Sequence, residues 1–278
     1  MNPTASYLRR GKNLRLKTLV LFTGTLLLSS CATDTFVAVS VDALEEPTFV
    51  AHRGGANRYP ESSVEAFRAV ASTGFPLEMD LRELQDGTLV PQHDPTVDRN
   101  MIGILGAIGT VTPDEWHESR VRGIAGGRAG TSTTWIEILD EFGGRTILVP
   151  ELKDRTSNLD EFASTIVDRG LQSSVLVQSF DIEVCKELAA KGLQVLYLFG
   201  LEEPDPEEIR ANGINFVGVS KSVRPEYLLL LKQAGLKVWP WTVNTVTEAR
   251  DLFKNGADGV FSDDPWLLSE AFPAVKTD

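Results

Sequence analysis

The sequence predicts a (β/α)8 barrel, or TIM barrel, with a small insertion after the second strand. From about residue 140 onward, a glycine stands near the end of each helical pattern, at intervals of 21 to 27 residues, and a short apolar run follows each one. The runs are nearly continuous in apolar residues, which is typical of parallel strands covered on both faces. Glycine at the end of a helix with a strand soon after it is the pattern of βα units. The glycines are Gly143, Gly170, Gly192, Gly213, Gly235 and Gly256.

Eight strands are expected in all. Six of the runs read TILVPEL, SVLVQSF, QVLYLF, NFVGVS, KVWPWTV and DGVFSD, and two earlier ones, TFVAH and PLEMDL, flank the helical pattern SSVEAFRAVASTG. Eight βα units in about 250 residues match the barrel. A doubly wound open sheet is the competing fold. The turn HRGGANRYP after the first strand lacks the Gly-x-Gly-x-x-Gly pattern that such a sheet usually carries there.

One stretch, between Leu84 and Thr134, interrupts this rhythm. It is glycine-rich, polar and too long for a simple connection, so we expect a loop excursion after the second strand, with the insertion at about residues 95–134. Its apolar segment MIGILGAIG, at residues 101–109, is either a packed loop or a shelter for an acyl chain.

The first thirty residues have the organisation of an export signal. Five basic residues precede an apolar run, residues 18–28, that is too short to span a bilayer comfortably. The run leads into the letters LSSC, which resemble a bacterial lipobox ending at Cys31. An ordinary signal peptide with an incidental cysteine is the alternative. We expect an exported protein, anchored by a lipid on Cys31 to a bacterial membrane and facing the periplasm or the exterior. The expected parts are a lipoprotein signal peptide over 1–30, a tether over 31–47 and the barrel over 48–278.

Composition and charge exclude some classes of function. The chain of 278 residues is 42% hydrophobic and 24% charged, which is ordinary for a folded domain. Its formal charge is −12, and loss of five basic residues with the signal would leave 22 basic against 39 acidic residues, a charge of −17. Nucleic acid would repel such a protein, so we expect no nucleic-acid partner. Once Cys31 is lipidated, Cys185 is the single remaining thiol and is expected to be a small core residue.

Polar and charged residues stand where the predicted strands end. This is the face of a barrel that carries catalysis, and charges at the ends of apolar strands are costly to place, so together they indicate a site. Two residues that are two apart on a strand point to the same side of it. In chain order the residues are His52-Arg53, Glu78 and Asp80, Glu151 and Lys153, Gln178, Lys221, Trp241 and Asn244, and Asp263-Asp264, and the inserted stretch adds His93-Asp94.

These residue types favour a metal-assisted reaction on an anionic substrate. The carboxylates Glu78, Asp80 and Glu151 suit one hard divalent cation, Ca²⁺ or Mg²⁺, whereas zinc would recruit more imidazole. An arginine and a lysine beside them can neutralise a phosphate, and His52 and His93 can move protons in opposite directions. The reaction inferred from these groups is cleavage of a phosphodiester.

The stretch AHRGGANRYPESSVEAFRAVASTGFPLEMDLRELQDGTLVPQHDPTVDR resembles the opening of the glycerophosphodiester phosphodiesterase family. The family pattern is His-Arg-Gly, Pro-Glu-Asn-Thr, Glu-x-Asp, Asp-Gly-x-x-Val and His-Asp. The later motifs ELK, WTVN and GADGVFSDDP extend the resemblance over the expected mature chain. The resemblance implies a (β/α)8 barrel with a small inserted region. It also implies His52 and His93 as the acid/base pair, Glu78, Asp80 and Glu151 as metal ligands, Arg53 and Lys153 as phosphate contacts, and Trp241 as a wall for the alcohol group.

The activity implied is metal-dependent hydrolysis of glycerophosphodiesters to an alcohol and sn-glycerol 3-phosphate. A lysophospholipase D-type enzyme acting on lipids is the alternative, and an inactive binding lipoprotein is disfavoured because no catalytic position is missing. Which histidine is the acid stays open, as does the choice between attack by water and attack by the substrate's own hydroxyl through a cyclic phosphate. The chain departs from the family at Ser62-Ser63, where Asn-Thr is usual, although serine can still cap the following helix.

Two pairs near the site have plainer interpretations. Asp263 and Asp264 precede a proline that suits the first turn of a helix, so both are expected to cap that helix. Asp98 and Arg99 are interpreted as a pair on the surface.

Overall fold

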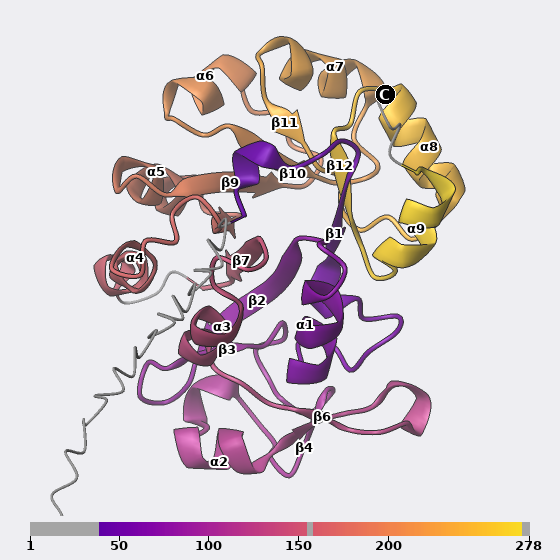
Figure 1. Ribbon diagram of the computed structural model, residues 1–278. Coiled ribbons are helices and arrows are strands. Elements are labelled where there is room, and N and C mark those ends of the chain that lie inside the picture. Colours follow the sequence, from indigo (N-terminus) through magenta and orange to yellow (C-terminus); the bar gives the residue numbers. More distant parts are fainter. Residues whose placement is uncertain (1–38, 155–157, 274–278) are drawn as a thin grey trace, which may run out of the picture. The chain divides into compact units, whose positions relative to one another are not determined.

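The computed structural model of the chain describes residues 39–154 and 158–273 (Figure 1). The predicted signal peptide, the lipidation site Cys31 and the first part of the predicted tether lie outside the described residues. Among the helices of the described residues, none combines the length and the apolar character needed to cross a membrane.

The described chain forms a nearly closed barrel of eight parallel strands, which confirms the predicted fold class and all eight expected strands. Backbone hydrogen bonds join the ends of the ring, from Asp258 N to Val238 O (2.9 Å), from Phe261 N to Pro240 O (3.0 Å) and from Val243 N to Phe261 O (2.8 Å). The strands, in spatial order, are β11 (Lys237–Val238), β10 (Phe216–Val219), β9 (Gln194–Phe199), β8 (Leu176–Ser179), β7 (Leu148–Leu152), β2 (Leu77–Glu83), β1 (Thr48–Ala51) and β12 (Gly259–Ser262).

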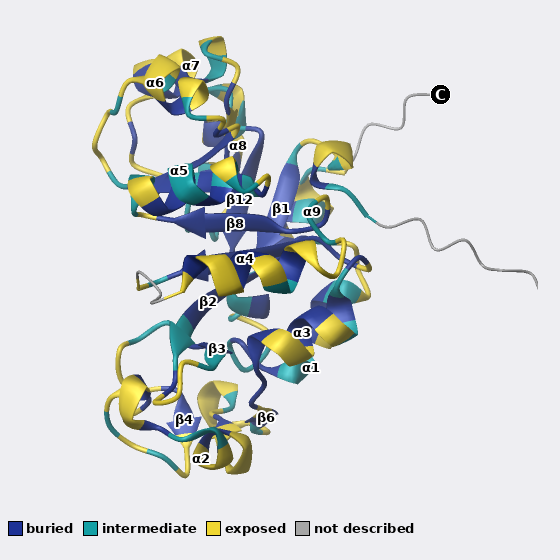
Figure 2. Ribbon diagram, turned by 90° about the vertical axis from the view of Figure 1, so that its left-hand side faces the viewer, coloured by how far each residue is buried: buried dark blue, intermediate teal, exposed yellow. Residues whose placement is uncertain are grey.

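Helices cover the outside of this barrel (Figure 1). Figure 2 shows that the strands are buried and that the helices turn exposed faces to solvent. As predicted, glycines with positive φ follow the helices at Gly170, Gly192, Gly213, Gly235 and Gly256, whereas at the end of α3 Gly144 takes this conformation instead of Gly143. The helices around the barrel are α1 (Val64–Ala71), α3 (Trp135–Phe142), α4 (Leu159–Val167), α5 (Ile182–Ala190), α6 (Pro206–Ala211), α7 (Pro225–Gln233), α8 (Val246–Lys254) and α9 (Pro265–Ala271).

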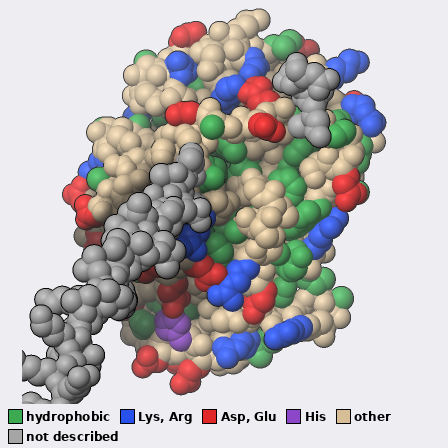
Figure 3. Space-filling view, in the orientation of Figure 1, with side chains coloured by type: hydrophobic (Ala, Val, Ile, Leu, Met, Phe, Trp, Pro, Cys, Tyr) green, Lys and Arg blue, Asp and Glu red, His purple; other side chains and the backbone are tan. Residues whose placement is uncertain are grey.

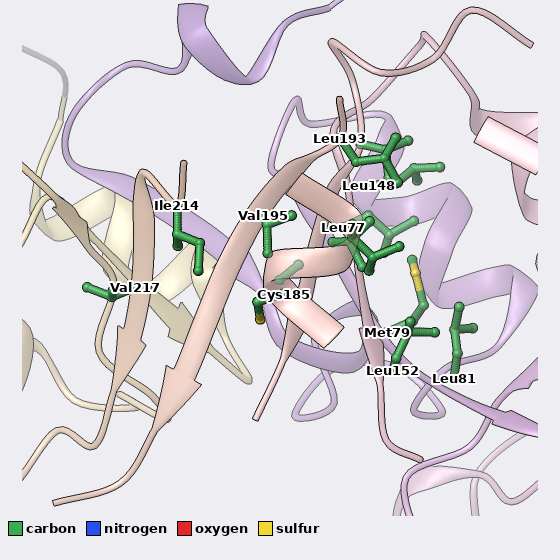
Figure 4. Close-up of a cluster of buried hydrophobic side chains, with 14 of the residues drawn as sticks. Leu77, Met79, Leu81, Leu148, Leu152, Cys185, Leu193, Val195, Ile214 and Val217 are labelled. Atoms are coloured by element: carbon green, nitrogen blue, oxygen red, sulfur yellow. The ribbon is translucent and has the colours of Figure 1, made fainter. Parts of the chain in front are cut away.

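The core is divided into a layer between strands and helices and a column inside the barrel. Alternation along β2 separates the two, because successive side chains of a strand point to opposite faces. Leu77, Met79 and Leu81 are buried in the layer between strands and helices (Figure 4). Cys185 lies in the same layer with 0% exposure, in agreement with its predicted core position. Glu78 and Asp80 point the other way, into the barrel, and this difference in direction creates the site.

The insertion is a folded unit, so the expectation of a loop excursion is wrong. Strand β3 (Leu89–Pro91) pairs antiparallel with β2, and β4 (Met101–Ile102), β5 (Arg120–Val121) and β6 (Gly130–Thr131) form a three-stranded sheet beside α2 (Pro113–Glu118). A separate apolar cluster that includes Met101 and Trp116 holds this unit together. Strands of two residues are too short to produce the alternation from which a strand is predicted, which explains the error.

Candidate active site

Apart from the lipidation site, the sequence predicts eight site residues. All eight are found in the lining of one pocket at the carboxyl ends of the strands. The interior strand side chains and the loops that follow the strands meet there. Outside this pocket, the face of the molecule drawn in Figure 3 carries acidic and basic side chains interspersed with hydrophobic ones. The lining residues are His52, Arg53, Glu78, Asp80, His93, Glu151, Lys153, Gln178, Phe180, Leu198, Trp241, Thr242 and Phe261.

An acidic triad, formed by Glu78, Asp80 and Glu151, lies at the base of the site. The register of β2 and β7 sets Asp80 opposite Glu151, and one oxygen of each carboxylate lies within 4.8 Å of the others. All three residues are buried. Burial and the charge of Asp80 raise the pKa of Glu78 to about 7 and that of Glu151 to about 8. Burial also raises the pKa of Asp80, but Arg53 and Lys153 lower it further than burial raises it.

The acidic triad has the composition of a cation site, with three carboxylates buried close together. Three buried carboxylates supply only hard oxygen ligands, which suits Ca²⁺ or Mg²⁺. Within the described residues, Oδ2 of Asp80 is buried and accepts no hydrogen bond, although Arg53 Nε lies 3.2 Å from it as an ion pair. A divalent cation would supply the positive charge that crowded carboxylates need to ionise together. The acidic triad can therefore hold a metal ion.

Arg53 and Lys153 supply positive charge beside the triad. Arg53 donates its backbone N–H to Glu78 Oε2 (2.6 Å), and its Nε lies 3.2 Å from Asp80 Oδ2. Lys153 Nζ lies 2.9 Å from Glu151 Oε1 and 3.5 Å from Asp80 Oδ1. Arg53 has φ of 51°, in the left-handed region, which places its amide toward the triad. Both cations can bind the oxygens of an anionic ligand in the pocket.

The glycine after Arg53 is required by this turn. Gly54 has φ of 78°, and a Cβ atom there would lie 2.8 Å from the Cβ of Ala66 in α1. Only glycine combines that φ with so close an approach to the helix. The His-Arg-Gly motif is therefore explained by backbone geometry as well as by chemistry.

His52 is held by a carboxylate that directly follows the last strand of the barrel. Its Nδ1 lies 2.6 Å from Asp263 Oδ1, and the other oxygen of Asp263 accepts a 2.6 Å hydrogen bond from Asn244 Nδ2. Burial lowers the pKa of His52, but the hydrogen bond to Asp263 and the charge of Glu78 outweigh it, so the pKa is raised above 6.5. The carboxylate of Asp263 keeps a lowered pKa and accepts the proton of Nδ1.

The expectation that Asp263 and Asp264 both cap α9 is therefore half wrong. Asp264 is the cap and accepts from Leu267 N (3.0 Å), while Asp263 supports His52. The two are adjacent in the sequence, and only the first stands at a strand end in the position of the other site residues. Its position at a strand end is the feature of the sequence that indicates a role for Asp263 in the site.

His93 is held in the same manner by its neighbour in the sequence. Its Nδ1 lies 2.7 Å from Asp94 Oδ1. Burial lowers its pKa below 6.5, and the charges of Asp80 and Asp94 only partly compensate. In both histidines a carboxylate occupies Nδ1, so Nε2 is the nitrogen left to exchange protons with a ligand.

One wall of the pocket is apolar. The rings of Phe180 and Trp241 meet edge to face with centroids 5.7 Å apart, and Lys153 Nζ lies 5.9 Å from the centre of the Phe180 ring. Phe180, which is 47% exposed, was missed as a site residue although it ends the predicted strand SVLVQSF. Lys221 lies outside this pocket lining and pairs with Glu248 Oε1 at 2.7 Å.

The fold and the site together define a barrel enzyme for anionic substrates. In sequence comparison, the family described as "Glycerophosphoryl diester phosphodiesterase family" matches residues 52–154 and 134–267. The chain therefore belongs to this family of phosphoric diester hydrolases, as the motifs predicted.

Individual relatives agree with this assignment. The glycerophosphodiester phosphodiesterase of Caldanaerobacter subterraneus subsp. tengcongensis is 29% identical over 232 residues, which cover 79% of this chain and 95% of that protein. Among solved structures, an Oleispira antarctica phosphodiesterase in complex with the product sn-glycerol-3-phosphate matches with a TM-score of 0.71 and 23% identity, covering 82% of this chain and 98% of that one. A Parabacteroides distasonis glycerophosphoryl diester phosphodiesterase matches with a TM-score of 0.70 and 24% identity, covering 85% and 88%.

Proposed function

We propose that the protein hydrolyses glycerophosphodiesters to an alcohol and sn-glycerol 3-phosphate, with a divalent cation on the acidic triad and with His52 and His93 as acid and base. The observation that carries the proposal is the convergence in one pocket of two histidines, each with Nδ1 held by a carboxylate, around a triad that can hold a metal. The naming of the relatives and the product bound to the Oleispira enzyme support the same substrate class.

The residues of the chain have distinct tasks in this reaction. A cation on the triad would supply charge that favours the developing negative charge of the phosphoryl group. Arg53 and Lys153 bind its non-bridging oxygens. His93, whose pKa is lowered, accepts the proton of the attacking hydroxyl at Nε2, while His52, whose pKa is raised, donates a proton from Nε2 to the leaving alcohol. The attacking group is water or the glycerol hydroxyl of the substrate, and the second route passes through a cyclic phosphate.

A lysophospholipid is the second candidate substrate, on the strength of the apolar wall. Phe180 and Trp241 can contact an acyl or head group beside the phosphate. The segment at residues 101–109 does not support this candidate, because none of its residues lines the described pocket. Comparing turnover of glycerophosphocholine with that of lysophosphatidylcholine separates the two substrates.

The reaction is tested by release of glycerol 3-phosphate from glycerophosphocholine. We expect EDTA to abolish release and either Ca²⁺ or Mg²⁺ to restore it. Glu78→Gln, which removes one ligand charge, is expected to lower kcat on the order of 1,000-fold even at saturating metal. Full turnover in EDTA or by Glu78→Gln would contradict the proposal, and no turnover of either substrate with any ion would favour a binding role.

Membrane attachment is a separate proposal that rests on the lipobox alone. Cys31 would carry the lipid and hold the enzyme at a bacterial membrane on the periplasmic or outer side. Cys31→Ser is expected to move the protein from the membrane fraction to the soluble fraction of the producing cell. An unchanged distribution would exclude the anchor.

A further inference from the structure

Arg99 joins two carboxylates outside the pocket. It lies in the segment between β3 and β4, and its Nε donates to Asp94 Oδ2 at 2.5 Å. Its two terminal nitrogens donate to Glu61, from Nη1 to Oε2 at 2.8 Å and from Nη2 to Oε1 at 2.6 Å. Such a bidentate arrangement fixes both groups in one plane. Glu61 follows the His-Arg-Gly turn, so Arg99 ties the insertion to the loop after β1.

Arg99 is connected to His93 through Asp94. Asp94 uses its second oxygen, Oδ1, to hold His93 Nδ1 at 2.7 Å. A free carboxylate of an exposed aspartate can rotate toward water, whereas here Arg99 occupies the opposite oxygen. Burial raises the pKa of Asp94, but the hydrogen bonds from Arg99 and His93 reverse this and lower it to about 2. Asp94 is therefore charged, oriented and available to His93.

The insertion holds the segment that carries Arg99. Arg122, which follows β5, donates from Nε to Arg99 O (3.1 Å) and from Nη2 to Met101 O (3.0 Å). The backbone N–H of Arg122 also donates to Asn100 O at 2.6 Å. None of residues 95–134 lines the described pocket. The contact through Arg99 is thus a route by which the insertion can act on catalysis without touching the substrate.

We infer that Arg99 is a positioning residue, which fixes the orientation and the tautomer of His93 by clamping Asp94 against Glu61. The expected effect on kcat rests on the proposed function, whereas the expected effect on the tautomer of His93 rests on geometry alone. It changes the interpretation of Arg99 from a member of a surface pair to a part of the support of the site.

The first test uses kinetics with a double-mutant cycle. We expect Arg99→Ala to lower kcat for glycerophosphocholine roughly 10-fold with KM changed less than about 2-fold. The base is misplaced, whereas Arg53 loses no direct partner: it contacts Glu61 only at 3.8 Å and stays held by Glu78 and Asp80. Added to Asp94→Asn, Arg99→Ala is expected to cause no further loss, since both act through one carboxylate. Arg68→Ala is the matched control, because Arg68 also makes a two-point contact with a glutamate, Glu141, and neither residue lines the pocket. It should leave kcat unchanged.

The second test needs no turnover and is chosen to separate failure of this inference from failure of the proposed function. The chain has only three histidines, so ¹⁵N-histidine labelling gives a simple NMR spectrum, and His93→Gln assigns the signal. Wild-type His93 should show a protonated Nδ1, and Arg99→Ala should shift the population toward protonated Nε2. If Arg99→Ala does not fold, Arg99→Gln, which keeps most of the side-chain length, is measured in the same way.

Two results would overturn the inference. One is an unchanged His93 spectrum in a folded Arg99 variant, whether or not the protein turns over glycerophosphocholine. The other is a loss of kcat that adds in full to that of Asp94→Asn, since Arg99 would then act independently of Asp94.

Discussion

His52 and His93 are both held at Nδ1 by an aspartate, but the two supports belong to different parts of the molecule. The support of His52 is built by the barrel: Asp263 follows β12, and Asn244 binds its second oxygen. The support of His93 is built by the loop after β3 and the insertion. The side chains of His52 and Asp263 are 18% and 21% exposed, and those of His93 and Asp94 are 34% and 26% exposed. Arg99, on which Asp94 depends, is 48% exposed.

One chemical task is therefore met twice in this pocket, once by a group at the barrel strands and once by a more exposed loop. In the described part of the chain, Asp263 accepts from His52 and Asn244, which follow the barrel strands β1 and β11. Asp94 relies on an arginine that is half in solvent, where water can replace a lost partner. We therefore expect the reaction to depend more strongly on the support of His52.

The largest effect is expected for Asp263→Asn. An uncharged amide stabilises the protonated form of His52 less than a carboxylate does, so the pKa of His52 falls, less of the acid is present, and kcat should fall on the order of 1,000-fold. Stopped assays of glycerol 3-phosphate release from glycerophosphocholine measure the change. Asp264→Asn is the control, because this neighbour caps α9 and should affect stability more than kcat. Equal kcat losses for both variants would contradict the assigned roles.

A smaller effect is expected for Asp94→Asn. An amide that donates to Nδ1 favours the tautomer of His93 with Nε2 protonated, which cannot accept a proton at that nitrogen. Because His93 and Arg99 are more exposed than His52, water can share in the support, so we expect a loss of roughly 100-fold. The ratio of kcat for Asp94→Asn to kcat for Asp263→Asn tests the comparison directly. A larger loss of kcat for Asp94→Asn would show that the reaction depends more strongly on Asp94 than on Asp263.

The dependence of kcat/KM on pH distinguishes the two aspartates, because loss of one should narrow the active pH range and loss of the other should widen it. In the wild type, rate should rise as His93 loses a proton, with a pKa below 6.5, and fall as His52 loses one, with a pKa above 6.5. Both aspartate hydrogen bonds raise the pKa of their histidine. Removing the one to Asp263 should move the alkaline limb to lower pH and narrow the active range. Removing the one to Asp94 should move the acid limb to lower pH and widen it. Parallel shifts of both limbs in one variant would contradict the assignment of acid and base.

The smallest effect is expected for Ser63→Ala, in the loop that follows His52. Ser63 Oγ accepts from Ala66 N at 3.2 Å and caps α1, as the sequence predicted despite the departure from Asn-Thr. Loss of the cap should cost about 1 kcal/mol of stability and lower the midpoint of thermal unfolding by about 2–4 °C. Turnover should stay within about 2-fold of the wild type. A large loss of kcat would show that the helix start helps to place His52.

Much of the fold could be predicted because its signals are local. The apolar strands and the glycines after the helices each occupy a few consecutive residues, and pairs such as Glu78 and Asp80 show their common direction by spacing alone. The insertion could not be predicted in the same way, because its two-residue strands are stabilised by an apolar cluster assembled from separate turns. Phe180 was missed because an aromatic residue that ends an apolar strand differs little in sequence from a core residue.

The barrel, the strand-end positions of the site residues and the family follow from the sequence, since these depend on periodicity and on motifs in order along the chain. The carboxylate that supports each histidine depends instead on contacts between distant segments. His52 and Asp263 are 211 residues apart, and Glu61 and Arg99 are 38 apart. No local pattern distinguishes Asp263, which supports His52, from Asp264, which caps a helix. Closure of the barrel brings the first and last strands side by side, and packing of the insertion brings Arg99 to Asp94, so these roles come from contacts that exist only in the folded chain.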